Sequence, residues 1–194
     1  MINTVKKYLP DGFKAETDRF GNLVASVKGV GKTFLLDAHA DRIGMIVTAV
    51  EDGGFLRVAK CGGMDARVLA AQDVTVWGKE PVYGVITSTP PHLSTAEDAK
   101  KAADFDKILI DTGLSKEKAA ELISPGDRVT VRSPYAELMN DRISGAALDD
   151  RAGCAMMIDM IKSDIEYDTW FVFNVQEEIG LRGSTVSAFS VAPD

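Results

Sequence analysis

The sequence predicts an α/β protein whose main domain is interrupted by a small inserted β-barrel. Two apolar runs, residues 33–36 and 169–175, have the composition of buried strands, and residues 146–161 are rich in Ala and Met at helical spacing. Residues 66–140 differ from both ends, because short β-like segments alternate there with turns. We therefore predict a discontinuous α/β domain in residues 1–65 and 141–194 around a barrel domain in residues 66–140.

The elements of the first part follow from local patterns. Residues 4–13 predict the tail of a helix that Pro10 and Gly12 end. Residues 14–27 predict two strands joined by a turn that contains Gly21 and Asn22. The strand at 33–36 is expected to be covered on both faces, and residues 43–50 predict a further strand.

The inserted region predicts a barrel with one short helix. Ser115 is a good N-cap residue, so a helix is expected over 116–123. The predicted strands are 73–77, 82–88, 107–111 and 128–132.

Composition narrows the class of partner. The 194 residues carry a net charge of −7, which argues against non-specific nucleic-acid binding and weakly against an anionic membrane surface. No signal segment or membrane span is evident, so a cytoplasmic protein is expected. Cys61 and Cys154 form no Cys-x-x-Cys pair and are expected to be reduced.

Three clusters at the ends of apolar runs supply a histidine and several carboxylates. His39 and Asp41 follow the first buried strand, at the carboxyl end where α/β proteins place their sites. His39 alone would more often be a structural residue. Asp41, however, could accept the hydrogen bond of the imidazole nitrogen that faces away from a metal.

The second and third clusters are Asp149-Asp150 and Glu177-Glu178. Helix capping alone would explain one aspartate, so the other is free to face inward as a ligand. Ionised carboxylates rarely follow a run as apolar as 170–175 without a partner, although an exposed loop is the simpler alternative. Imidazole with carboxylates is a ligand set for zinc, cobalt or manganese, and it indicates a metallohydrolase.

Other hydrolytic chemistries fit less well. Adjacent Glu177 and Glu178 do not present two carboxyl groups across a sugar bond, as a glycosidase requires, and they would leave His39 unexplained. No Gly-x-Ser-x-Gly elbow occurs, and neither cysteine has an evident histidine base. His92 lies in the inserted region and more simply serves loop structure.

These motifs, in this order and spacing, resemble the TET-type dinuclear metallo-aminopeptidases. That family includes glutamyl and leucyl aminopeptidases and some proteins named endoglucanase M. The matching segments are 36–44, 62–65, 90–93, 111–113, 125–127, 147–154 and 176–183.

The resemblance implies a role for each residue. His39 would bind one metal, Asp149 would bridge two, and Glu178 would bind the second. Glu177 would be the general base, and Asp41 would support His39. Two divalent ions, zinc or cobalt, would then activate water for the cleavage of peptides from their amino end. The inserted barrel would serve dimerisation and assembly into a dodecamer.

The resemblance also implies gaps. The family uses an aspartate shortly beyond the Glu-Glu pair and a histidine further downstream, and Asp194 precedes both. The main domain is thus expected to be an incomplete aminopeptidase-type α/β/α domain. The strands of Phe34 and Phe171 would lack neighbours. A fragment of a metallo-aminopeptidase is the first hypothesis. A catalytically silent assembly module is the second, and a glycoside hydrolase is the third.

Overall fold

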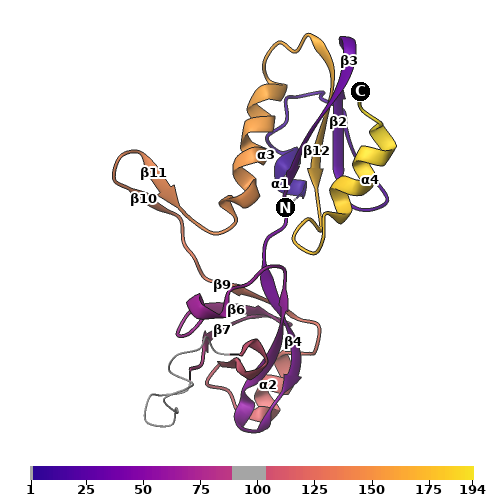
Figure 1. Cartoon of the computed structure of the whole chain (residues 1–194). Helices are drawn as coiled ribbons and strands as arrows, with labels where there is room; N and C mark the ends of the chain where they lie inside the picture. Colours follow the sequence, from indigo (N-terminus) through magenta and orange to yellow (C-terminus); the bar gives the residue numbers. More distant parts are fainter. Residues whose placement is uncertain (1, 89–103) are drawn as a thin grey trace. The chain divides into compact units, whose positions relative to one another are not determined.

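The computed structural model describes residues 2–88 and 104–194 and divides the chain into two compact units (Figure 1). Unit 1 comprises Met1–Arg42 and Ala147–Asp194, and unit 2 comprises Ile43–Ala146. The predicted α/β class is confirmed, and unit 2 contains a closed barrel. The Pro90-Pro91 segment, His92 and most of the expected polar stretch 94–106 lie outside the described residues.

A four-stranded mixed sheet forms the centre of unit 1. The strand β12 pairs antiparallel with β2 and parallel with β3, so it has a neighbour on each side. Its buried Phe171 and Phe173 show no exposed surface, as expected for the apolar run. The strands across the sheet are β1 (Ala15–Thr17), β2 (Leu23–Val27), β12 (Tyr167–Asn174) and β3 (Val30–His39).

Two expectations for this sheet need correction. Phe171 does not lack neighbours, because β12 is a central strand. For the strand of Phe34 the expectation is confirmed, because β3 lies at the edge of the sheet. However, β3 is not covered on both faces as expected, since Phe34 is 45% exposed. An apolar run reports that a segment favours burial, whereas the number of neighbouring strands depends on long-range pairing.

Helices cover both faces of this sheet (Figure 1). The short α1 (Ile2–Lys6) and α3 (Leu148–Ile161) contribute Val5, Met157 and Ile161 to the same core as the sheet. Helix α4 (Arg182–Val191), which the sequence patterns did not predict, lies across the sheet from α3. It places the buried Gly183 and Ser187 toward the turn of Asn22.

Unit 2 is a closed six-stranded barrel with its own apolar core. Val74, Val76, Ile110 and Leu56 in this core have no exposed surface. The strands in order around the barrel are β4 (Gly44–Val50), β5 (Leu56–Cys61), β8 (Leu109–Asp111), β7 (Pro81–Ile86), β6 (Asp73–Trp77) and β9 (Arg128–Val131).

The barrel begins earlier in the chain than expected. The sequence predicts residues 43–65 in the α/β domain, but β4 pairs with β9 and β5 with β8, so both strands belong to unit 2. Local periodicity shows that 43–50 is a strand, but not which sheet it joins. The far boundary lies after Ala146 and not after residue 140.

Short elements complete unit 2. Ser115 caps α2 (Lys116–Leu122) by accepting a hydrogen bond from the Lys118 backbone N–H, as its residue type predicted. An exposed hairpin, β10 (Ala136–Leu138) and β11 (Arg142–Ser144), follows the barrel. The 3₁₀ helices are η1 (Asp52–Gly54), η2 (Ala66–Val68) and η5 (Phe105–Lys107).

Candidate metal centre

The candidate centre lies in unit 1, where two parallel strands end. His39 is the last residue of β3, and it is in register with Asn174, the last residue of β12. The next backbone hydrogen bond, from Ala40 N–H to the Asn174 carbonyl, keeps the two chains together beyond the strands. The residues that follow each strand are therefore brought to one edge of the sheet.

Asp41 holds the backbone of the glutamate pair. Its two carboxylate oxygens accept hydrogen bonds from the backbone N–H groups of Glu177 and Glu178, both at 3.3 Å. Gln176, just before the pair, has a φ of 61°, in the left-handed region, which turns the chain sharply after β12. The two glutamates are thereby fixed beside His39.

The two aspartates of the second cluster have different contacts. Asp150 accepts a hydrogen bond from the Gly153 N–H at 3.0 Å and caps α3, whose regular helical dihedrals begin after it. Asp149 instead lies with its Oδ1 3.1 Å from Nε2 of His39. One aspartate therefore serves the helix, and the other faces the imidazole.

Three side chains form a group with the geometry of a metal site. His39, Glu177 and Glu178 each offer one ligand atom, and these atoms lie within 4.8 Å of one another. Within residues 2–88 and 104–194 this is the one such group found. Glu177 Oε2 is 3.6 Å from Nε2 of His39. Asp149 is near the group but is not part of it, and its side chain is 92% exposed.

Burial and neighbouring charges shift the pKa values of two members of the group. Burial by itself would lower the pKa of His39, but the hydrogen bond with Asp149 and the charge of Glu177 outweigh it and raise that pKa above its ordinary value. Burial also raises the pKa of Glu178; the nearby imidazole lowers it, and the charge of Glu177 raises it further. Neighbouring carboxylates thus raise the pKa of His39, and burial is the main cause of the raised pKa of Glu178.

Within the described residues, one side of the His39 imidazole has no hydrogen-bond partner. Nδ1 of His39 is buried, and the oxygen of Asp41 is 3.7 Å away, which is too long for a hydrogen bond. Asp41 therefore lies on the expected side of the imidazole, but its hydrogen bonds go to the backbone of the glutamate pair. The oxygen and nitrogen donors that His39, Glu177 and Glu178 bring together fit a divalent ion.

Two supporting contacts were not predicted from the sequence. The buried thiol of Cys154 donates to the backbone carbonyl of His39 at 3.4 Å, and Asn174 donates to Asp37 at 2.7 Å. The two residues lie within predicted elements, but their types give no signal for these contacts. Hydrogen-bond partners more than a hundred residues apart in the sequence can be identified only from the three-dimensional structure.

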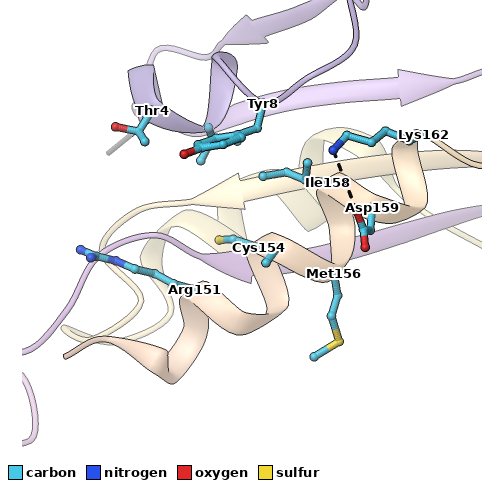
Figure 2. Close-up of a pocket in the computed structure, with 10 residues that line it drawn as sticks. Thr4, Tyr8, Arg151, Cys154, Met156, Ile158, Asp159 and Lys162 are labelled. Atoms are coloured by element: carbon cyan, nitrogen blue, oxygen red, sulfur yellow. Dashed lines mark ion pairs between the residues drawn. The ribbon is translucent and has the colours of Figure 1, made fainter. Parts of the chain in front are cut away.

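A separate groove lies between α1 and α3 (Figure 2). It has a volume of about 480 Å³, and Tyr8, Cys154 and Ile158 contribute to its apolar lining. Asp159 and Lys162 form an ion pair of 3.9 Å at its side. His39 and the two glutamates are not among the lining residues, so the groove is not the candidate centre.

A mixed sheet with a His-carboxylate group at the ends of parallel strands defines an α/β protein with a candidate metal centre. The family model described as M42 glutamyl aminopeptidase matches residues 21–194, and the chain belongs to this family. The family is metal-dependent, in agreement with the donor group. The resemblance found in the sequence motifs is thereby confirmed.

Individual aminopeptidases are similar to nearly the whole of this chain. A putative aminopeptidase of Acetivibrio thermocellus is 38% identical over 182 residues, which cover 92% of this chain and 53% of the relative. A solved aminopeptidase from the archaeon Desulfurococcus kamchatkensis has a TM-score of 0.90 and 33% identity, covering 100% of this chain and 55% of that one. The Pyrococcus horikoshii TET1 peptidase, which can assemble into a tetrahedron or a large octahedral shell, has a TM-score of 0.87 and 35% identity over 99% of this chain and 60% of that one. The chain thus spans about half the length of its relatives.

Across the described ranges, no helix combines the length and apolarity required to cross a bilayer.

Proposed function

We propose that this chain carries the metal-binding half-site of an aminopeptidase that removes residues from the amino end of peptides. The observation that carries the proposal is the convergence of His39, Glu177 and Glu178 within 4.8 Å at the end of β3 and β12. Family membership gives the reaction class. The relatives are about twice as long, so the activity of the whole protein is part of the proposal.

Three side chains would hold divalent ions: His39 and Glu178 as terminal ligands, and Asp149 between two ions. The exposed side chain of Asp149 lies 3.1 Å from the imidazole, close enough to share in holding the ions. Zinc or cobalt suits this donor set. When bound, such ions supply Lewis-acid polarisation of a carbonyl and lower the pKa of a water.

Glu177 would move the proton. Its carboxylate belongs to the group, 3.6 Å from the imidazole, and is partly accessible, so it could accept a proton from the attacking water and pass it to the departing amine. Asp41 is a positioning residue, because it touches only the imidazole side and the backbone N–H groups of the glutamate pair. The carboxylates of the group would also attract the positively charged α-amine of a peptide substrate.

A homo-oligomer is the expected state of the protein. The TET1 peptidase, which forms closed shells, matches 99% of this chain, including the barrel. The second candidate function, a silent assembly module, is favoured by the closed barrel with its own core. Glycoside hydrolysis has less support, because neighbouring Glu177 and Glu178 share one site with an imidazole.

The test measures metal content and turnover separately. Four proteins are compared: the parent chain, Glu177→Gln, His39→Ala and the exposed control Glu166→Gln. Each is dialysed against zinc or cobalt, its metal content is measured, and its turnover of aminoacyl p-nitroanilides is assayed. We expect Glu177→Gln to retain metal and lose turnover by about 10²-fold or more. His39→Ala should lose both, and Glu166→Gln neither.

Three results would contradict the proposal. If the parent chain binds fewer than one metal ion and shows no turnover, it is not an enzyme by itself, and the assembly module is favoured. Normal turnover in Glu177→Gln would show that Glu177 is not the general base. Cleavage of β-glucan without cleavage of any aminoacyl substrate would favour glycoside hydrolysis.

A further inference from the structure

Asp37 is a half-buried carboxylate beside the candidate metal centre, but it is not one of the three members of the donor group. It lies two residues before His39 on β3, and alternate residues of a strand share one face of the sheet. At a rise of about 3.3 Å per residue, the Cα atoms of the two residues are about 6.5 Å apart. The carboxylate is therefore the neighbour of the imidazole along the strand.

Asn174 holds this carboxylate in place. Its side-chain nitrogen donates a hydrogen bond of 2.7 Å to Oδ1 of Asp37, and only 1% of its surface is exposed. Asn174 is the last residue of β12 and pairs in register with His39. One buried amide thus joins the Asp37 carboxylate to the strand end that leads into the glutamate pair.

The surroundings of Asp37 disfavour its negative charge. Burial is the largest cause of the raised pKa of its carboxyl, and the charges of Asp150 and Glu177 raise that pKa further. The Asn174 hydrogen bond and the His39 imidazole lower the pKa, but they do not compensate. Within the part of the chain that the structure describes, no lysine or arginine forms an ion pair with Asp37. A charge in such a place lowers the stability of the folded chain unless a cation lies nearby.

We propose that Asp37, held by Asn174, strengthens the binding of divalent ions at the metal centre from outside the ligand group. Its negative charge attracts the ions that His39 and Glu178 would hold. Asp37 is a positioning residue, because it acts on the ions without touching them. The charge that is unfavourable in the metal-free chain becomes favourable when a cation is bound. This inference rests on the proposed function, since it concerns the same centre.

Asp168 provides a matched carboxylate with a different environment. It lies near the start of β12, in the same sheet, and its side chain is 18% exposed. Its carboxylate pairs with Lys28 at 3.2 Å and accepts a hydrogen bond from the Thr33 hydroxyl at 3.1 Å. The charge of Asp168 is thus compensated within the fold, and a metal ion is not needed for it.

The first test compares Asp37→Asn with the control Asp168→Asn. Asparagine removes the charge at residue 37 and keeps an oxygen that can accept the Asn174 hydrogen bond. In the presence of a chelator, we expect Asp37→Asn to raise the melting temperature of unit 1 by about 2–4 °C, because an uncompensated charge is lost. Trp170 fluorescence in a Trp77→Phe background follows this unit. Asp168→Asn should not raise the melting temperature.

The second test is the affinity of the same variants for zinc, measured by competition with a chromogenic chelator. Asp37→Asn should raise the zinc dissociation constant about tenfold or more, and Asp37→Ala should do the same. Asp168→Asn should leave the constant unchanged. A chain that becomes more stable without metal and binds zinc more weakly is not expected from a merely structural residue, whose loss lowers stability.

The outcomes separate this inference from the proposed function. If the parent chain binds zinc and both Asp37 variants bind it equally well, the metal centre stands and the role of Asp37 is overturned. A lower melting temperature in Asp37→Asn together with weaker zinc binding would also overturn it, because a general loosening of unit 1 explains both changes. A parent chain that binds no zinc overturns the proposed metal centre and this inference together.

Discussion

The backbone N–H of Val175 donates a hydrogen bond of 3.1 Å to the side-chain oxygen of Asn22, 153 residues earlier in the sequence. The amide nitrogen of the same side chain donates to the carbonyl of Gly183 and to the hydroxyl of Ser187. Asn22 has no exposed surface. One buried amide thus connects the β1–β2 turn, the end of β12 and α4, directly beside the loop that carries the glutamate pair.

Replacing Asn22 by Ala should destabilise unit 1. The change leaves the part-buried N–H of Val175 and the buried carbonyl of Gly183 without this partner, so we expect a loss of about 2–4 kcal/mol in the free energy of unfolding. Urea denaturation is followed by the fluorescence of Trp170 in a Trp77→Phe background. The exposed Asn3→Ala is the control, and a loss below about 0.5 kcal/mol in Asn22→Ala would contradict the network.

The central strand of unit 1 should be sensitive to truncation. Phe171 is fully buried between two neighbouring strands, so Phe171→Ala should cost about 3–5 kcal/mol through lost burial and the cavity left behind. Phe189 on α4 is 89% exposed, and Phe189→Ala should change the stability by less than about 0.5 kcal/mol. Equal effects of the two substitutions would mean that Phe171 is not in the core.

Removing the Asp41 carboxylate should weaken metal binding without removing any proposed ligand. Asp41→Ala frees the backbone N–H groups of Glu177 and Glu178, so the glutamates lose their fixed position. We expect the zinc dissociation constant to rise about 10–100-fold, measured by competition with a chromogenic chelator. The exposed Asp11→Ala should leave it unchanged. An unaltered dissociation constant in Asp41→Ala would assign Asp41 to the fold alone.

Alkylation should distinguish the two cysteines. Burial raises the pKa of the Cys154 thiol to about 11, so only about one molecule in a thousand carries the reactive thiolate at pH 8. Cys61 is only partly buried and should react with iodoacetamide first. In Cys61→Ser, the rate at Cys154 should rise about tenfold per pH unit between pH 8 and pH 10, because the thiolate fraction rises in that proportion. Mass spectrometry follows both sites, and a fast, pH-independent reaction of Cys154 would show that its thiol is not protected.

The sequence by itself determined the features that depend on neighbouring residues. The run 169–175 predicted a buried strand, Ser115 predicted the start of α2, and the clusters at His39 and Glu177 marked the ends of two strands. Each of these signals comes from side-chain periodicity or from a cap within a few residues, so it survives without knowledge of the fold.

Only the tertiary structure decided which of these parts meet. It joined β4 to β9 and so moved the start of the barrel to Ile43, and it placed β12 between two neighbouring strands. It also gave Asp41 partners 136 and 137 residues away in place of the imidazole hydrogen bond expected from spacing. The physical reason is the same in each case: strand pairing and hydrogen bonding to a distant backbone depend on loop closure and packing of the whole unit, which no local pattern records.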